Sequence, residues 1–280
     1  MSLADKLFKK TCREILFNGT NDFDEKVRPR WEDGVPAHTK KAFCIVNRYD
    51  LSKEFPILTL RKTNFNAALD EILWIWQKKS NNVKDLNSHI WDSWADETGS
   101  IGKAYGYQLR QKAIYDVKGE DIPFDQVDRV LWQLKHEPSS RRILTNIYNF
   151  EDLHEMNLAP CAYSMTFDVS EGRLNGILNQ RSNDVIVANN WNVVQYAALI
   201  MMFAQVSGLK PGQLVHVIAN AHIYDRHFQI AEELMNRQEY RAPRLVINPN
   251  VKDFYNFTVD DFELKGYNYG ESVGKLPVAV

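Results

Sequence analysis

The chain contains few cysteines, and this scarcity argues against a disulfide-stabilised protein and against a cysteine metal site. Its 280 residues include only Cys12, Cys44 and Cys161. An odd number at wide spacing predicts neither a disulfide framework nor a CxxC metal site. A chain of this length can bury a large core without such supports. Reduced thiols are typical of the cytosol, so we expect a cytoplasmic protein.

The chain also lacks an excess of positive charge. Its net charge is -2, which gives no general attraction for nucleic acid or an anionic membrane. An anionic ligand must therefore be bound by a few well-placed arginines. Long apolar runs are missing too, because Gln195 and Gln205 interrupt the longest, around residues 193–206. That run predicts a buried helix rather than a membrane span.

Several functional motifs are absent. The sequence has no GxGxxG, no Walker A motif and no HExxH spacing, which argues against a dinucleotide fold, an NTPase and a zinc site. We expect no bound metal. Internal repeats and Pro/Gly linkers are missing as well, so residues 1–280 are predicted to form one domain.

The hydrophobic spacing predicts a mixture of helices and strands. Helices are expected over residues 3–17, 64–78, 125–136, 192–207 and 222–237. Strands are expected over residues 143–149, 162–169, 173–180 and 213–219. Residues 18–40 are rich in Gly, Asp, Pro and basic residues and are predicted to be a loop. The mixture indicates an α+β fold.

Cys161 is the candidate nucleophile. Pro160 fixes the backbone just before the strand that Cys161 precedes. If that strand and the next form a hairpin about residues 171–172, Cys161 faces Gln180 and Arg181. A guanidinium beside a thiol favours the reactive thiolate. A buried, inert cysteine is the alternative.

Glu71 is the candidate acid or base. Its helical neighbours three and four residues away are all apolar. A carboxyl group on such a face either has a raised pKa or is paired. A raised pKa suits proton transfer near neutral pH. The alternative is an edge residue whose carboxylate reaches solvent or an arginine.

Other polar groups could bind a phosphorylated ligand. Arg141 and Arg142 follow two serines, a combination that suits phosphate. The polar run 180–184 directly follows an apolar strand and gathers many donors and acceptors at one strand end. The alternative for Arg141 and Arg142 is a place on the solvated surface, and the alternative for the run 180–184 is a generic loop.

Two further pairs of residues could contact a nucleoside or a heterocycle. His222 and Tyr224 lie two residues apart at a predicted strand–helix boundary, where both could reach a sugar hydroxyl. Trp91 and Trp94 either belong to the core or stack on a flat ring.

These segments occur together, in order, in one known family. From about residue 55 to the end the chain resembles thymidylate synthase. The segments that carry the resemblance are Asp-Glu-Ile-Leu-Trp (70–74), Ile-Trp-Asp-Ser-Trp-Ala-Asp (90–96), Ala-Tyr-Gly-Tyr-Gln (104–108), Ser-Arg-Arg-Ile (140–143), Leu-Ala-Pro-Cys (158–161), Gln-Arg-Ser-x-Asp (180–184), Asn192, Ala-His-Ile-Tyr (221–224) and the terminal Pro-Val-Ala-Val.

The resemblance implies a methyltransferase of nucleotide biosynthesis. Such an enzyme converts dUMP to dTMP with 5,10-methylenetetrahydrofolate, which becomes dihydrofolate. Cys161 would add to C6 of the uracil ring, and Glu71 would order waters and assist proton transfer. Tyr105 would act near the C5 proton, and Arg181 beside the thiolate. Asn192 would read the pyrimidine through its amide.

The resemblance also implies the groups that bind the ligands. For dUMP they are Arg28 (with Arg30 as the alternative), Arg141 and Arg142 from the partner subunit, Gln180, Arg181, Ser182, Asp184, Asn192, His222 and Tyr224. For folate they are Trp91, Trp94, Asp184 and the carboxylate of Val280, which would help close a lid. The implied fold is a mixed, twisted β-sheet packed by long helices, with sheets back to back in a homodimer.

Three positions depart from the family pattern. Ala162 replaces the usual histidine after the nucleophile, residues 187–191 replace the usual segment before the asparagine, and Asn220 replaces an acidic residue. These changes suggest a divergent branch, such as one found in bacteria and their viruses. The alternatives are a deoxycytidylate hydroxymethylase-like enzyme, which would carry an acidic residue at position 192, and a non-catalytic nucleotide-binding relative, which would lose Cys161 or Glu71.

Overall fold

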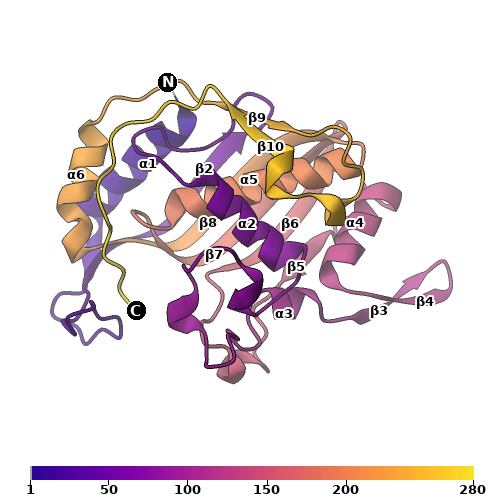
Figure 1. Cartoon of the computed structure of the whole chain (residues 1–280), viewed down its shortest axis with the longest axis horizontal. Helices are drawn as coiled ribbons and strands as arrows, with labels where there is room; N and C mark the ends of the chain where they lie inside the picture. The colour runs from indigo at the N-terminus through magenta and orange to yellow at the C-terminus, as the bar shows by residue number, and fades with distance from the viewer. Residues whose placement is uncertain (1) are drawn as a thin grey trace.

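A mixed six-stranded sheet organises the protein in this computed structural model, which describes residues 2–280 (Figure 1). β7 and β8 are parallel, and every other neighbouring pair is antiparallel. In spatial order the strands are β1 (Thr20–Asn21), β2 (Thr39–Asp50), β8 (Lys210–Tyr224), β7 (Arg173–Asp184), β6 (Ala162–Ser170) and β5 (Leu144–Asn146).

Helices and two small sheets complete the fold. The α-helices are α1 (Leu3–Arg13, continued by a π-helix over Glu14–Asn18), α2 (Phe65–Trp76), α3 (Gly106–Leu109), α4 (Gln126–His136), α5 (Asn189–Val206) and α6 (Phe228–Asn236). Single 3-10 turns span Val83–Asp85, Asp92–Trp94, Leu153–Glu155, Asp225–His227, Phe254–Asn256 and Val259–Asp261. The two-stranded sheets pair β3 (Ala113–Val117) with β4 (Glu120–Phe124), and β9 (Arg244–Ile247) with β10 (Phe262–Lys265). Among residues 2–280, no helix is long and apolar enough to cross a membrane.

Helix α5 is the centre of the core. Most of its side chains are buried, since it lies between the sheet and α2 (Figure 1). Gly176 on β7 allows this close approach, because a Cβ there would lie only 2.7 Å from Ile200 Cδ1. The next residue, Ile177, therefore points to the opposite face of the sheet.

The β6–β7 hairpin has the predicted turn. Glu171 and Gly172 both have positive φ angles, 51° and 70°, as a type I′ turn requires. Ser170 pairs with Arg173, and at the other end of the hairpin Ala162 pairs with Gln180. The Arg181 amide donates to the Cys161 carbonyl at 2.9 Å. The predicted placement of Cys161 opposite Gln180 and Arg181 is confirmed.

Several predicted boundaries are wrong. The run 180–184 belongs to β7 rather than to a loop, because parallel pairing with β8 satisfies its backbone. The strand predicted over 213–219 extends over Lys210–Tyr224, and the helix predicted from residue 222 begins at Phe228, after a 3-10 turn. The strand predicted over 143–149 is only Leu144–Asn146. The loop predicted over 18–40 contains β1 and the first two residues of β2, because these residues pair with other strands, and β2, which was not predicted, pairs along most of β8.

The sheet face opposite α5 carries exposed apolar side chains. Ile177 lies on this face, and its cross-strand neighbour Thr166 pairs in turn with Leu144. Ile177 and Leu144 are each 40% exposed, and Val46 on β2 is 48% exposed. Apolar side chains in a sheet face without covering helices are typical of an interaction surface.

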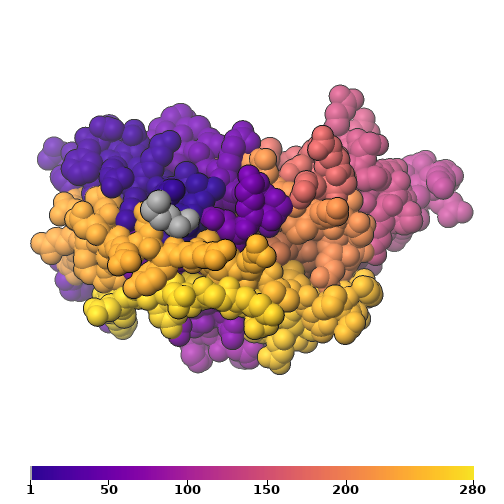
Figure 2. Space-filling view, turned by 90° about the horizontal axis from the view of Figure 1, so that it is seen from above, coloured from indigo at the N-terminus to yellow at the C-terminus, as the bar shows by residue number. Residues whose placement is uncertain are grey.

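Two segments extend along or away from the main body. The β3–β4 hairpin projects from the side of the molecule that carries α4 (Figures 1 and 2). The C-terminal segment, yellow in Figure 2, crosses the surface as a continuous band. Its last residue, Val280, exchanges backbone hydrogen bonds with Arg30 at 2.9 and 3.0 Å. The C-terminus is thus attached to the loop before β2.

Asn190, in the first turn of α5, connects this helix to the segment before α2. Its side chain accepts from Leu58 N and Thr63 Oγ1 and donates to Pro56 O, at 2.8 to 3.0 Å.

Replacing Asn190 by alanine leaves buried backbone groups without partners, so we expect a loss of about 3 kcal/mol in the free energy of unfolding, measured in urea. The exposed Asn18→Ala variant should lose no more than ~0.5 kcal/mol. Equal midpoints for the two variants would contradict this assignment.

Candidate active site

Cys161 lies at the start of β6, where Arg181 holds the preceding loop. The Arg181 guanidinium donates to the carbonyl groups of Pro160 at 2.9 Å and of Ala159 at 2.7 Å. Its Nη2 also lies 3.8 Å from Cys161 Sγ. One arginine therefore fixes the backbone before the cysteine and contacts the sulfur.

The charge state of Cys161 reflects two opposing effects. Burial raises the pKa of the Cys161 thiol, and the nearby Arg181 charge lowers it, with burial the larger effect. The prediction that Arg181 favours the thiolate is correct in direction. This effect is smaller than that of burial, because moving a thiolate out of water costs more free energy than the attraction of one guanidinium offsets.

Glu71 on α2 is the buried carboxyl group of the site. It is 5% exposed, and burial raises its pKa to about 7. Hydrogen bonding opposes this shift, first from Trp191, whose Nε1 donates to Oε2 at 2.7 Å. The predicted desolvation of Glu71 is confirmed, and a pKa near neutrality allows the group to accept and return a proton.

Asn192 lies in the first turn of α5, beside β7. Gln180 Nε2 donates to Asn192 Oδ1 at 3.0 Å. Asn192 Nδ2 donates in turn to Gln195 Oε1 at 3.1 Å. Since an amide oxygen accepts twice and an amide nitrogen donates twice, Asn192 keeps one acceptor and one donor position free for a ligand.

Tyr105 connects the aromatic residues to Cys161. Its hydroxyl accepts from Cys161 N at 3.2 Å, and its ring lies 4.9 Å from that of Trp91. Tyr105 also has a positive φ of 47°, an uncommon backbone conformation that tends to occur at functional sites. Trp94 packs on Trp91 with ring centroids 5.7 Å apart. Burial raises the pKa of Tyr105 well above its ordinary value, so the phenol is neutral.

His222 and Tyr224 occupy the end of β8, next to the polar end of β7. Their rings meet edge to face at 5.1 Å. His222 pairs with Asp184, and Ser182 pairs with Asn220 in the parallel register. Burial lowers the pKa of His222, which favours the neutral imidazole. Asp184 accepts from the amides of Ile186 and Val187 and so shapes the turn that leads to α5.

Arg28 and Arg30 differ in their surroundings. Burial raises the pKa of Tyr224 to about 12, and the charge of the nearby, exposed Arg28 opposes this shift. The Arg30 guanidinium donates to Gly34 O at 3.0 Å. Its backbone is paired with Val280, as described above. Arg28 is thus the arginine near the end of β8.

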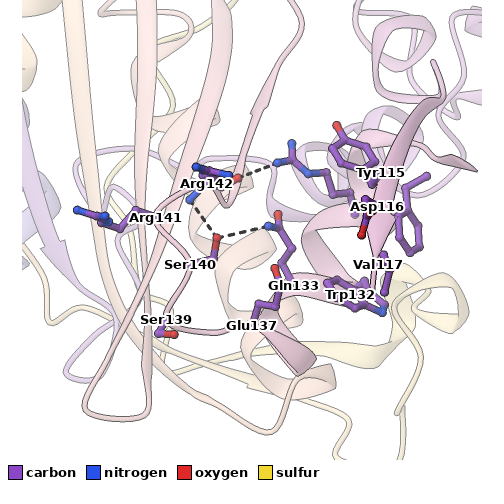
Figure 3. Close-up of a pocket in the computed structure, with 12 residues that line it drawn as sticks. Tyr115, Asp116, Val117, Trp132, Gln133, Glu137, Ser139, Ser140, Arg141 and Arg142 are labelled. Atoms are coloured by element: carbon purple, nitrogen blue, oxygen red, sulfur yellow. Dashed lines mark hydrogen bonds between the residues drawn. The ribbon is translucent and has the colours of Figure 1, made fainter. Parts of the chain in front are cut away.

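Arg141 and Arg142 lie apart from these residues, after α4. They line a cavity of about 470 Å³ between α4 and the β3–β4 hairpin, together with Ser139 and Ser140 (Figure 3). Figure 3 shows Arg141 pointing away from the other labelled side chains. Both arginines are exposed.

Sequence reasoning missed some of the polar groups around Cys161 and Asn192. Trp191 enters the sequence pattern only as part of the altered segment 187–191, and Gln195 only as an interruption of an apolar run. No sequence motif includes His216, which is fully buried. A polar residue inside an apolar helix or strand was the available signal, because such a residue must find a partner when buried.

Comparison with known proteins extends over nearly the whole chain. The family model described as thymidylate synthase matches residues 6–280. A thymidylate synthase of Bacillus subtilis subsp. natto is 45% identical over 277 residues, which cover 98% of each chain. A thymidylate synthase of Bacillus phage phi3T is also 45% identical over 277 residues, again covering 98% of each chain.

A solved structure agrees with these sequence matches. Thermostable thymidylate synthase A from Bacillus subtilis superimposes with a TM-score of 0.93 at 44% sequence identity. The match covers 99% of both chains. The six-stranded sheet and the helices that pack on it are therefore those of a known fold.

The buried carboxyl group of Glu71 predicts a pH-dependent stability. Because the pKa is raised from 4.5 to about 7, the folded protein keeps a proton that the unfolded chain releases. The resulting stabilisation is complete below pH 4.5 and is lost as the pH rises through 7. The loss should reach ~3 kcal/mol at most. Glu71→Gln should remove this part of the slope in denaturant titrations across that range. An identical slope in both proteins would contradict the raised pKa.

Proposed function

This chain belongs to the thymidylate synthase family and catalyses the methylation of dUMP to dTMP, and we propose that Cys161 is the residue that bonds to the substrate. The observation that carries this proposal is the contact between Cys161 Sγ and Arg181, 3.8 Å apart, in a site that also contains Glu71 and Asn192. The family implies 5,10-methylenetetrahydrofolate as co-substrate, and bound folate supplies the one-carbon unit and the hydride.

Cys161 begins the reaction by adding to C6 of the uracil ring. The S–C6 bond forms from the thiolate electron pair, and the C5=C6 electrons move towards C5 and O4. C5 thereby becomes the nucleophile that receives the one-carbon unit. When the sulfur later leaves C6, the C5=C6 double bond is restored. Because burial raises the pKa of Cys161, addition requires loss of the thiol proton, which Arg181 favours.

Glu71 and Tyr105 handle the protons of the reaction. Glu71, with a pKa of about 7, orders water and exchanges a proton near O4. Tyr105, whose hydroxyl accepts from the Cys161 amide, lies near the C5 proton that must leave. Ala162 contributes no polar group beside the nucleophile, and the indole N–H of Trp191 donates to Glu71.

The substrate is bound along the ends of β7 and β8. Arg181, Ser182 and Arg28 bind the phosphate of dUMP, while His222 and Tyr224 bind the deoxyribose hydroxyl. Gln180 and Asn192 form the edge that reads the pyrimidine, with Asp184 at the border towards folate. The parallel register that places Ser182 beside Asn220 and Asp184 beside His222 supports this arrangement.

Folate fits the aromatic side of the site. Trp91 and Trp94 pack together beside Tyr105 and offer flat apolar surface for a heterocycle. The carboxylate of Val280 closes over the ligands in this proposal, which the backbone pairing of Val280 with Arg30 supports. Closure of this segment would exclude water from the charged intermediates.

The enzyme acts as a homodimer, with residues 1–280 forming one thymidylate synthase domain. The exposed apolar residues Val46, Leu144 and Ile177 on the uncovered sheet face support back-to-back packing of two sheets. Arg141 and Arg142 then bind the phosphate in the partner's site, which explains their exposure. Three free thiols suit a reducing cytoplasm.

The covalent step can be tested with 5-fluoro-dUMP, whose C5 fluorine cannot leave as a proton does. The purified enzyme with this nucleotide and methylenetetrahydrofolate should form an adduct visible by mass spectrometry. Cys161→Ala should form no adduct yet retain dUMP binding. The matched control Cys12→Ala, at a buried cysteine on α1, should still form it. An adduct in Cys161→Ala would refute the assignment.

The shared site can be tested by mixing two inactive variants. Cys161→Ala lacks the nucleophile, and an Arg141→Ala/Arg142→Ala double variant lacks the partner's phosphate ligands. Refolding them together should restore about a quarter of wild-type activity, because half of the dimers are mixed and each contains one intact site. Mixtures that stay inactive, although mixed dimers are detected by mass, would argue against sharing across the interface.

A further inference from the structure

Four polar side chains form a chain of hydrogen bonds between β8 and α5. His216 Nε2 lies 2.7 Å from Gln180 Oε1, Gln180 Nε2 donates to Asn192 Oδ1 at 3.0 Å, and Asn192 Nδ2 donates to Gln195 Oε1 at 3.1 Å. His216, Gln180 and Gln195 are no more than 2% exposed. Water therefore does not compete for these bonds. Turning over a single amide would place two donors or two acceptors opposite each other.

The bonds of this chain share one direction. Each amide presents one oxygen that only accepts and one nitrogen that only donates. If Gln180 turned over, its oxygen would face Asn192 and its nitrogen would face His216. Asn192 would then have to turn over as well. The two ends of the chain therefore decide the orientation of the Asn192 amide in the middle.

At the β8 end, His216 acts as a donor. Burial lowers the pKa of His216 to about 3, so the imidazole is neutral and one ring nitrogen donates while the other accepts. Asn47 on β2 is its direct cross-strand neighbour and is also buried. Neither Asn47 Nδ2 nor His216 Nδ1 has a hydrogen-bond partner among residues 2–280. The bond of the His216 ring goes to Gln180 Oε1, which only accepts, so the proton of the neutral imidazole lies on Nε2.

At the α5 end, the bond between Asn192 and Gln195 has the same direction. Gln195 Oε1 accepts from Asn192 Nδ2, whereas Gln195 Nε2 has no hydrogen-bond partner among residues 2–280. Gln195 lies close enough to Glu71 to lower the pKa of that carboxyl group. The bonds at both ends of the chain thus agree, and the Asn192 amide has one favoured orientation.

We propose that His216 is a positioning residue that holds the Asn192 amide in the orientation that fits uracil and rejects cytosine. This inference rests on the proposed role of Asn192 as the reader of the base. In the fixed orientation, the free Oδ1 position accepts from uracil N3–H and the free Nδ2 hydrogen donates to O4. Cytosine presents an acceptor at N3 and donors at N4, so both contacts become repulsive.

The selectivity for the base can be measured by replacing His216. His216→Met removes the donor with a side chain that adapts to a core. The dissociation constants for dUMP and dCMP, measured by calorimetry on the same preparation, should differ about 10- to 100-fold less than in the wild type. His216→Gln restores an N–H donor and should recover most of the difference. Because both nucleotides use the same folded molecules, partial unfolding cancels from the ratio.

An unchanged ratio in His216→Met, or equal loss in the methionine and glutamine variants, would overturn the positioning role. If His216→Met does not fold, Gln180→Met interrupts the next link and should reduce the ratio in the same way. The 5-fluoro-dUMP adduct of the wild type separates this inference from the proposed function. A wild type without an adduct contradicts the mechanism, whereas an adduct with an unchanged ratio contradicts only the role of His216.

Discussion

The parallel pairing of β7 with β8 is the constraint on which the site depends. It places Gln180, Arg181 and Ser182 on one strand beside His216 and His222 on the next. The β6–β7 hairpin then brings Cys161 to the same place from the other side. Gly176 contributes by letting α5 approach β7, and so Asn192 reaches Gln180. Residues distant in sequence are thereby held on adjacent rigid elements, which is the arrangement that precise chemistry requires.

Desolvation governs the chemistry of this site. Burial raises the pKa of Glu71 to about 7, keeps Tyr105 protonated and raises the pKa of Cys161 against the charge of Arg181. The same low polarity strengthens the hydrogen bonds that run from His216 to Gln195. A nucleophile, an acid–base group and a base-reading amide thus share one environment. In it, each polar group must be paired, and its orientation is set by its partner.

The sequence determined the local features. Helical spacing located α2, α4 and α5, and the Glu-Gly pair at residues 171–172 located the hairpin turn, because each pattern acts over a few residues. The apolar neighbours of Glu71 indicated for the same reason that its carboxyl group either has a raised pKa or is paired, and burial in the structure raises the pKa. The ordered segments from residue 70 to residue 224 indicated the family, and the matched relatives confirm it.

Only the tertiary structure decided the features that depend on pairing between distant segments. β2 and the polar end of β7 are strands because pairing with β8 satisfies their backbone groups. The net pKa of Cys161 depends on how deeply the fold buries it, which neither Pro160 nor Arg181 reveals. Gln180, Asn192 and His216 look unrelated in sequence, and they act together only because the fold brings them together and burial leaves polar side chains few other partners.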